Sequence, residues 1–125
     1  MATILIVEDD KFLSSAYRLK FTKVGFMVYL AFDGEEAISL LSTGIPDVIL
    51  LDLVMPVKDG FTVLSELKNN TQWSTIPVIV TSNLSQKEDI DKVKALGAKD
   101  FIVKSDISLD ELVKKVQDII HTQKT

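Results

Sequence analysis

The sequence of 125 residues contains no cysteine and only one histidine. Without cysteine, the protein forms no disulfide, carries no thiol nucleophile and has no thiolate ligand for a metal ion. This usage is typical of proteins in the reducing cytoplasm, and we expect a cytoplasmic location. Disulfide chemistry and cysteine-based metal sites are therefore excluded.

An excess of positive charge is also absent, as are long apolar runs. Fourteen Lys and Arg residues against eighteen Asp and Glu give a net charge of −4 and a sequence pI near 4.9. Such a chain offers no bulk attraction to nucleic acid or to an anionic membrane. The longest apolar stretch, residues 24–32, is well short of the about 18 residues that a membrane-spanning helix needs. We expect neither nucleic acid nor membrane as a direct partner.

The chain does contain enough apolar sequence for one hydrophobic core. Its length and its 46% of hydrophobic residues predict a single domain over residues 1–125. Short runs rich in apolar and β-branched residues predict five strands, at 3–7, 27–31, 47–51, 78–81 and 101–103. Because residues 4–7 and 48–51 are continuously apolar, helices must cover both faces of the sheet, as in parallel sheets.

The segments between these strands show the apolar periodicity of helices. It is clearest near the end of the chain, where Leu109, Leu112, Val113 and Val116 fall on one helical stripe. Strands alternating with helices, joined by right-handed crossovers, predict an open doubly wound sheet. The fold class is therefore α/β: a (βα)5 flavodoxin-like three-layer sandwich with a parallel five-stranded sheet in the order 2-1-3-4-5.

Helix ends carry their own signals. The S-x-x-E patterns that begin at Ser85 and Ser108 fit capping boxes and predict two helix starts. Gly25, Gly44 and Gly97 each follow a periodic segment, where a left-handed residue commonly ends a helix. These signals divide the chain into βα units with short loops.

Acidic residues follow two of the predicted strands. The first strand ends in Glu8, Asp9 and Asp10, and the third ends at Asp52. In an open parallel sheet, ligands bind beyond the carboxyl ends of the strands, and neighbouring strands one and three would bring these acids together. Carboxylates so close repel one another unless they are protonated or bridged by a cation, and oxygen ligands without His or Cys favour Mg²⁺. The simpler alternative, that Glu8 and Asp10 only cap the first helix, is the role expected of Asp10.

Polar residues also end the fourth and fifth strands. Ser82 follows the fourth strand and Lys104 the fifth, so a hydroxyl and an ammonium group join the acids at the same edge. With these residues in place, the chain resembles the receiver domain of two-component response regulators, of the stand-alone chemotaxis-regulator type, over essentially its whole length. The motifs that carry the resemblance are Glu8-Asp9, Asp52 with Met55-Pro56 and Asp59-Gly60, Ser82, and Phe101-x-x-Lys104.

The resemblance implies a phosphoacceptor and a metal site. It implies that Asp52 attacks the phosphoryl group of a phosphohistidine to form an acyl phosphate. It further implies that Asp9 and Asp52 are direct Mg²⁺ ligands, with the backbone carbonyl of Val54 as a third ligand and Glu8 acting through water. The metal offsets charge on the transferring group.

The resemblance also implies a switch. Lys104 is expected to pair with one phosphoryl oxygen, and the hydroxyl of Ser82 to move and bond another. Phe101 is expected either to turn inward as Ser82 leaves its space or to be an ordinary core residue.

The implied function is that of a phosphoacceptor in a two-component phosphorelay, not an enzyme with turnover. The implied partners are a sensor histidine kinase or phosphotransfer protein and a downstream protein target, with the chain a monomer or a weak, phosphorylation-linked dimer. A degenerate receiver that acts as an unphosphorylated scaffold is the main alternative. An FMN module is disfavoured because Glu8, Asp9 and Asp10 would repel phosphate, and a dehalogenase-like phosphatase because Val54 replaces its second aspartate.

Two departures from the family pattern lead to predictions. Ser105 stands where the family usually has a proline, so the Lys104–Ser105 peptide should be trans, with an altered loop and an output surface shaped for an unusual partner. Val54 and Leu84 stand where polar side chains often position the attacking water. Because neither side chain forms hydrogen bonds, we expect slow autodephosphorylation.

Overall fold

A five-stranded parallel sheet forms the centre of the molecule. The computed structural model describes residues 1–83 and 86–124. The elements follow in the order β1 (Thr3–Val7), α1 (Lys11–Lys23), β2 (Met27–Ala31), α2 (Gly34–Leu41), β3 (Val48–Asp52), α3 (Gly60–Lys68), β4 (Val78–Ser82), α4 (Lys87–Ala95), β5 (Asp100–Val103), a 3₁₀ turn (Lys104–Asp106) and α5 (Leu109–Lys124).

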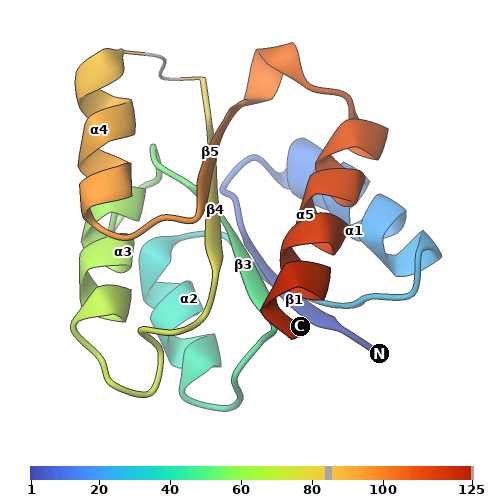
Figure 1. Ribbon diagram of the computed structural model, residues 1–125, viewed down its shortest axis with the longest axis horizontal. Coiled ribbons are helices and arrows are strands. Elements are labelled where there is room, and N and C mark those ends of the chain that lie inside the picture. The colour runs from blue at the N-terminus through green and yellow to red at the C-terminus, as the bar shows by residue number, and fades with distance from the viewer. Residues whose placement is uncertain (84–85, 125) are drawn as a thin grey trace.

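The strand order is β2-β1-β3-β4-β5, as the sequence predicts. Figure 1 shows α1 and α5 on one side of the sheet and α2, α3 and α4 on the other. The predicted strands β1 and β2 have the observed bounds, whereas β3 is shifted by one residue and β4 and β5 are each one residue longer. The predicted α/β three-layer architecture is confirmed.

Each face of the sheet packs into its own hydrophobic core. Along β1 and β3, Ile4, Ile6, Val48 and Leu50 face the core beneath α1 and α5. Their neighbours Leu5, Val7, Ile49 and Leu51 face the core beneath α2, α3 and α4. Every residue of β3 is buried. This two-sided burial explains why β1 and β3 are apolar up to the acidic residues at their carboxyl ends.

Two of the predicted glycine caps and one of the capping boxes are confirmed. Gly25 and Gly97 have φ values of 98° and 95°, which are left-handed. At the start of α5, the Glu111 amide donates to the Ser108 hydroxyl oxygen and the Ser108 amide donates to the Glu111 carboxylate, both at 3.1 Å. These bonds satisfy amides that a helix start leaves without partners.

One other helix-end prediction, the glycine cap at Gly44, is wrong, and the capping box at Ser85 stays a prediction. Gly44 does not have a positive φ, because α2 already ends at Leu41 and the hydroxyls of Ser42 and Thr43 bond back to its last carbonyls. Helix α4 begins after Gln86, whose side chain makes no capping bond. Ser85 itself lies outside the described residues.

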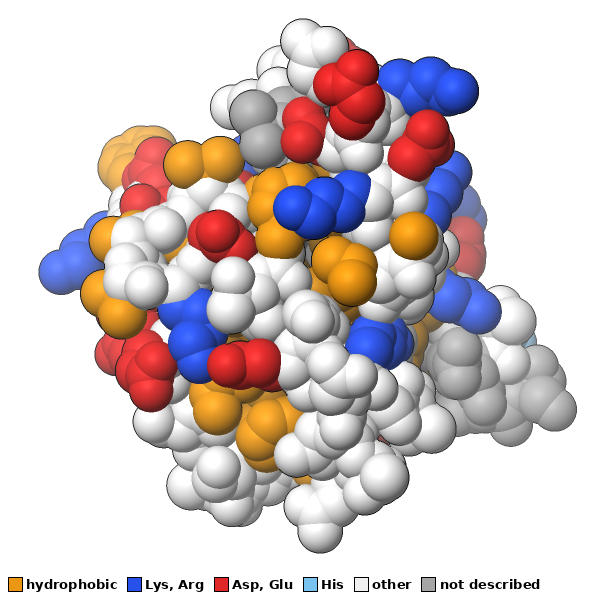
Figure 2. Space-filling view, turned by 90° about the vertical axis from the view of Figure 1, so that its left-hand side faces the viewer, with side chains coloured by type: hydrophobic (Ala, Val, Ile, Leu, Met, Phe, Trp, Pro, Cys, Tyr) orange, Lys and Arg blue, Asp and Glu red, His pale blue; other side chains and the backbone are white. Residues whose placement is uncertain are grey.

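No helix in the described ranges is long and apolar enough to cross a membrane. Figure 2 shows the face formed on the left of Figure 1, where basic and acidic side chains lie next to one another at several points. The charges on this face are therefore mixed in sign.

Candidate functional site

The carboxyl ends of β1 and β3 bring three acidic residues together, as the sequence predicts. The two strands are paired, with Val7 opposite Leu51, so the residues that follow them share one edge of the sheet. Carboxylate oxygens of Glu8, Asp9 and Asp52 all lie within 4.8 Å of one another. Glu8 and Asp52 are only 1% and 5% exposed, while Asp9 is exposed to solvent.

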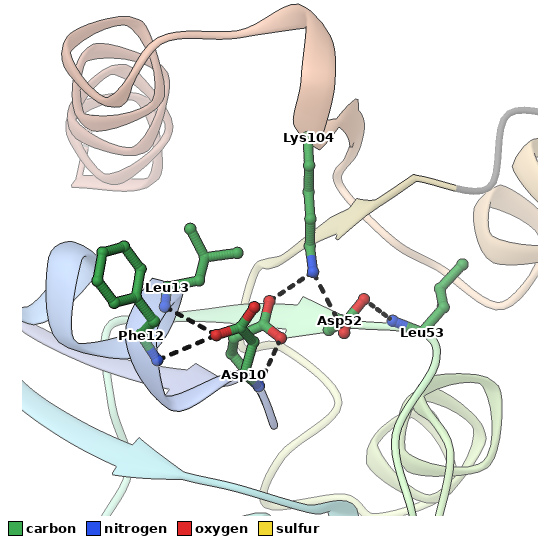
Figure 3. A network of polar contacts seen from close by, with 7 residues as sticks. Asp10, Phe12, Leu13, Asp52, Leu53 and Lys104 are labelled. Atoms are coloured by element: carbon green, nitrogen blue, oxygen red, sulfur yellow. Dashed lines mark hydrogen bonds and ion pairs between the residues drawn. The ribbon is translucent and has the colours of Figure 1, made fainter.

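Lys104 reaches this cluster from the end of β5. Its ammonium nitrogen lies 2.5 Å from Oε1 of Glu8 and 3.3 Å from Oδ2 of Asp52 (Figure 3). Since β4 lies between β3 and β5, the long side chain has to extend past the end of β4. It places one cation between two buried carboxylates, which reduces their mutual repulsion.

Burial and these close charges shift the pKa values of the group. Burial raises the pKa of Glu8 and the nearby Asp52 carboxylate adds to the shift, while the hydrogen bond from Lys104 only partly offsets it. Burial works against the charge on Lys104, but its hydrogen bond to Glu8 and its attraction to Asp52 outweigh burial, so the pKa of Lys104 is raised. The Lys104 side chain therefore keeps its proton, and its positive charge, at neutral pH.

Backbone amides fix the two buried carboxylates. The amide of Leu53 donates to Oδ1 of Asp52 at 2.8 Å, which leaves Oδ2 directed toward Lys104. The amide of Asp10 donates to Oε2 of Glu8 at 3.1 Å. Both oxygens of Glu8 are thus already bonded within the protein.

Asp10 caps α1, which confirms the role expected of it. Its carboxylate accepts hydrogen bonds from the amides of Phe12 at 3.0 Å and Leu13 at 3.1 Å. A side-chain oxygen at this position satisfies amides that have no partner within the helix. The third acid after β1 is therefore structural.

The Asp59-Gly60 pair lets α3 begin directly against the end of β3. Asp59 caps the helix by accepting from the amide of Thr62 at 2.8 Å. A Cβ atom on Gly60 would lie 2.2 Å from the backbone oxygen of Asp52 and 2.7 Å from the Cα of Leu53. Only glycine fits such a close approach, so this motif serves the geometry around Asp52.

The proposed switch residues lie on β4 and β5. Ser82 ends β4, is 1% exposed and is paired in the sheet with Val103. Phe101 is half-buried and packs against the core beneath α2, α3 and α4. Val54 lies just beyond Asp52 with an exposed side chain, whereas Leu84 lies outside the described residues.

The peptide between Lys104 and Ser105 is trans, as predicted, since the described part of the chain contains no cis peptide. The residues after β5 form a short 3₁₀ turn over Lys104–Asp106. This turn directs the chain from β5 toward α5.

Sequence reasoning missed two features of the site. It did not foresee the direct pairing of Glu8 with Lys104, because nothing local links residues so far apart. It also missed Tyr17, which is buried in the core beneath α1 and α5, and whose pKa is raised by burial and by the charges of Glu8 and Asp52. The only sequence signal for Tyr17 is its place on the inner stripe of α1 with Ser14 and Phe21, which predicts packing alone.

The donor set fits a hard divalent cation. The cluster offers only oxygen ligands from Glu8, Asp9 and Asp52, one of them open to solvent, and has neither His nor Cys among its ligating side chains. Magnesium prefers a few carboxylates and keeps several waters. The site is therefore chemically suited to Mg²⁺.

Comparisons with known proteins agree with this arrangement. Residues 4–117 match the family model of the response regulator receiver domain. The chain is 32% identical over 117 residues to a probable transcriptional regulator ycf27 of Guillardia theta, covering 94% of this chain and 44% of that protein. It therefore spans less than half the length of that curated relative.

Solved structures show the same similarity. The receiver domain of the Francisella response regulator 1452 is 33% identical, with a TM-score of 0.89 and full coverage of both chains. The Mn(2+)-bound form of response regulator Rcp1 is 31% identical, with a TM-score of 0.82, over 95% of this chain and 91% of that chain.

Proposed function

The chain belongs to the response regulator receiver domain family, and on that basis we propose that it accepts a phosphoryl group on Asp52 in a two-component phosphorelay. The observation that carries this proposal is the convergence of Asp52 with Asp9, Glu8 and Lys104 at the carboxyl end of the sheet. The protein acts as a phosphoacceptor whose modification changes its protein contacts, not as an enzyme with turnover.

In the proposed reaction, a carboxylate oxygen of Asp52 attacks the phosphorus of a phosphohistidine on the donor. The new O–P bond forms as the N–P bond breaks, and the electron pair leaves with the imidazole nitrogen. The amide of Leu53 holds Oδ1 of Asp52, so Oδ2 is the better placed nucleophile. Lys104, 3.3 Å from Oδ2, is positioned to pair with an oxygen of the incoming phosphoryl group.

The same residues would hold the metal ion. Asp9 and Asp52 would bind Mg²⁺ directly, with the backbone carbonyl of Val54 as a third ligand. Both oxygens of Glu8 already accept hydrogen bonds, which supports an indirect role for Glu8 through a water molecule. When bound, Mg²⁺ supplies positive charge against the phosphoryl oxygens.

Phosphorylation would be read out through the neighbouring strands. We assign the switch to Ser82, whose hydroxyl would bond a phosphoryl oxygen, and to Phe101, which would follow it inward. The donor would be a sensor histidine kinase or a phosphotransfer protein, and the receiver of the signal a downstream protein that recognises the surface around β5, α5 and Ser105. The chain would remain a monomer or form a weak dimer when phosphorylated.

Treatment with acetyl phosphate and Mg²⁺ tests this proposal. Intact-mass spectrometry should detect one added phosphoryl group in the native chain and in Asp118→Asn, which removes an exposed carboxylate from α5. The increment should be absent from Asp52→Asn. If the native chain folds and binds Mg²⁺ but gains no phosphoryl group, the alternative of an unphosphorylated scaffold holds instead.

A further inference from the structure

The loop between β3 and α3 contains a strained turn centred on Val57. Its φ of 68° lies in the left-handed region, which β-branched residues adopt only at a cost. The amide of Lys58 donates to the carbonyl of Pro56 at 2.7 Å, an i to i+2 bond that closes a γ-turn of the rare positive-φ kind. Val57 is 80% exposed, so packing of its own side chain does not hold this conformation.

The next residue, Lys58, ties the turn to two helices. Its ammonium nitrogen lies 2.8 and 2.9 Å from the two carboxylate oxygens of Glu66 on α3. It also lies 3.5 Å from a carboxylate oxygen of Glu35 on α2. The Lys58 side chain is 19% exposed, less than either acid that it joins. One cation therefore connects the loop to both neighbouring helices.

The backbone of the same residue lies against the start of α2. A Cβ atom on Gly34 would be 2.5 Å from the carbonyl oxygen of Lys58 and 2.8 Å from its Cβ. At its base the loop is closed by the amide of Gly60, which donates to the carbonyl of Leu53 at 2.9 Å. Val54 thus lies in a short loop held at two points, its base and Lys58.

We propose that Lys58 is a positioning residue, which holds the strained turn at Val57 and thereby the backbone carbonyl of Val54 in place beside Asp52. This inference rests on the proposed function, since it takes that carbonyl as a metal ligand. The strain at Val57 favours relaxation of the loop, and the ion pairs with Glu35 and Glu66 oppose that relaxation. Lys58 itself touches neither metal nor phosphoryl group.

The direction in which Mg²⁺ affinity changes when Lys58 is replaced distinguishes a positioning role from a purely electrostatic one. Removing a cation from an acidic protein should, by charge alone, strengthen Mg²⁺ binding. Loss of a positioning contact should weaken it. In Lys58→Met, Mg²⁺ titrated into the full chain and followed by calorimetry should bind about three- to tenfold more weakly, somewhat less than the loss typical of mutated outer-shell partners.

Lys87→Met is the matched control. Lys87 is 90% exposed and pairs with Asp91 at 3.8 Å on α4, so its replacement changes the net charge equally without touching the loop. Its Mg²⁺ affinity should be unchanged or slightly higher. In a Val57→Asn background, where the residue tolerates a positive φ, Lys58→Met should cost less affinity than in the native chain.

A measurement without metal tests the contact between Lys58 and the loop independently of the proposed phosphorelay function. Amide hydrogen exchange of Lys58 and Gly60 in EDTA should be faster in Lys58→Met and unchanged in Lys87→Met. Unchanged exchange together with unchanged or tighter Mg²⁺ binding in Lys58→Met would overturn the positioning role. If the native chain bound no Mg²⁺, the proposed function would fail with it, while faster exchange would still assign the loop contact to Lys58.

Discussion

The ammonium group of Lys104 and the carboxylate of Glu8, 96 positions apart in the sequence, form an ion pair of 2.5 Å at the centre of the site. Both side chains are largely buried. Their mutual attraction is therefore the main interaction that offsets the cost of removing each charge from water. Because the same lysine also faces Asp52, it offsets the repulsion between the two buried carboxylates.

Lys104→Met should therefore lower the free energy of unfolding by about 3 kcal/mol at pH 7 in EDTA, because it leaves a buried carboxylate unpaired. Urea denaturation measures this change. Lys20→Met is the control: Lys20 pairs with Asp110 at the same 2.5 Å, but Asp110 is 81% exposed, and its loss should cost less than about 1 kcal/mol. Equal losses in the two variants would contradict the importance of burial.

The difference in unfolding free energy between the native chain and Lys104→Met should become smaller as the pH falls toward 5. Burial and Asp52 raise the pKa of Glu8 above its unfolded value, and loss of Lys104 raises it further. The folded variant then binds more protons than the unfolded chain in this range, so its stability increases as the pH falls through the raised pKa. A deficit that grows on acidification, in the same denaturation series, would show that Glu8 is not the group responsible.

Mg²⁺ should raise the thermal unfolding midpoint of the native chain, and EDTA should reverse the effect. A ligand that binds only the folded state adds about 2.7 kcal/mol at one hundred times its dissociation constant. Asp9→Asn should lose most of this response while remaining folded, because the Asp9 side chain lies in the acidic cluster but is exposed to solvent, not buried in the core. A full response in Asp9→Asn would remove Asp9 from the ligand set.

The acyl phosphate should decay slowly. Val54, whose side chain is 61% exposed, and Leu84 offer no hydrogen-bonding group to orient an attacking water. After removal of the phosphoryl donor, the double variant Val54→Asn/Leu84→Glu should lose its phosphoryl group faster than the native chain in the presence of Mg²⁺. Equal decay rates would mean that water reaches the phosphorus by another route.

Val57→Asn should stabilise the protein by about 1 kcal/mol, because a left-handed conformation costs an ordinary L-residue about 1–2 kcal/mol and Asn tolerates it better. Val24→Asn is the control: Val24 is another partly exposed valine, but its φ is −94°. Its replacement should change stability by less than about 0.5 kcal/mol. If Val57→Asn and Val24→Asn changed the urea midpoint equally, backbone strain at Val57 would not be the cause of the stabilisation.

Gly60→Ala and Gly44→Ala should have opposite effects. A methyl group on Gly60 would collide with the backbone of Asp52, so this variant should be destabilised by more than about 2 kcal/mol and lose phosphorylation by acetyl phosphate. Nothing lies within 4 Å of a Cβ on Gly44, whose φ is not positive, so Gly44→Ala should be neutral or stabilising by up to about 1 kcal/mol. Similar losses in both would contradict the close approach at Gly60.

Local pattern in the sequence was enough to predict the sheet and the edge where the acids meet. Continuous apolar runs require cover on both faces, and the polar residues Glu8, Asp52, Ser82 and Lys104 each stand where such a run ends. The parallel topology then carries them to one edge. The helix starts and ends were less predictable, since the hydroxyls of Ser42 and Thr43 compete with a glycine cap within a few residues of Gly44.

Only the tertiary structure decided which of these groups pair and which backbone is strained. The contact between Lys104 and Glu8 depends on a side chain that extends past β4, and no spacing in the sequence encodes that reach. The same is true of Gly60, whose need for glycine comes from the backbone of Asp52, and of Val57, held by ion pairs that its neighbour Lys58 makes with two helices. Periodicity reports which side of an element is buried, whereas distances between side chains of different elements arise only when those elements pack.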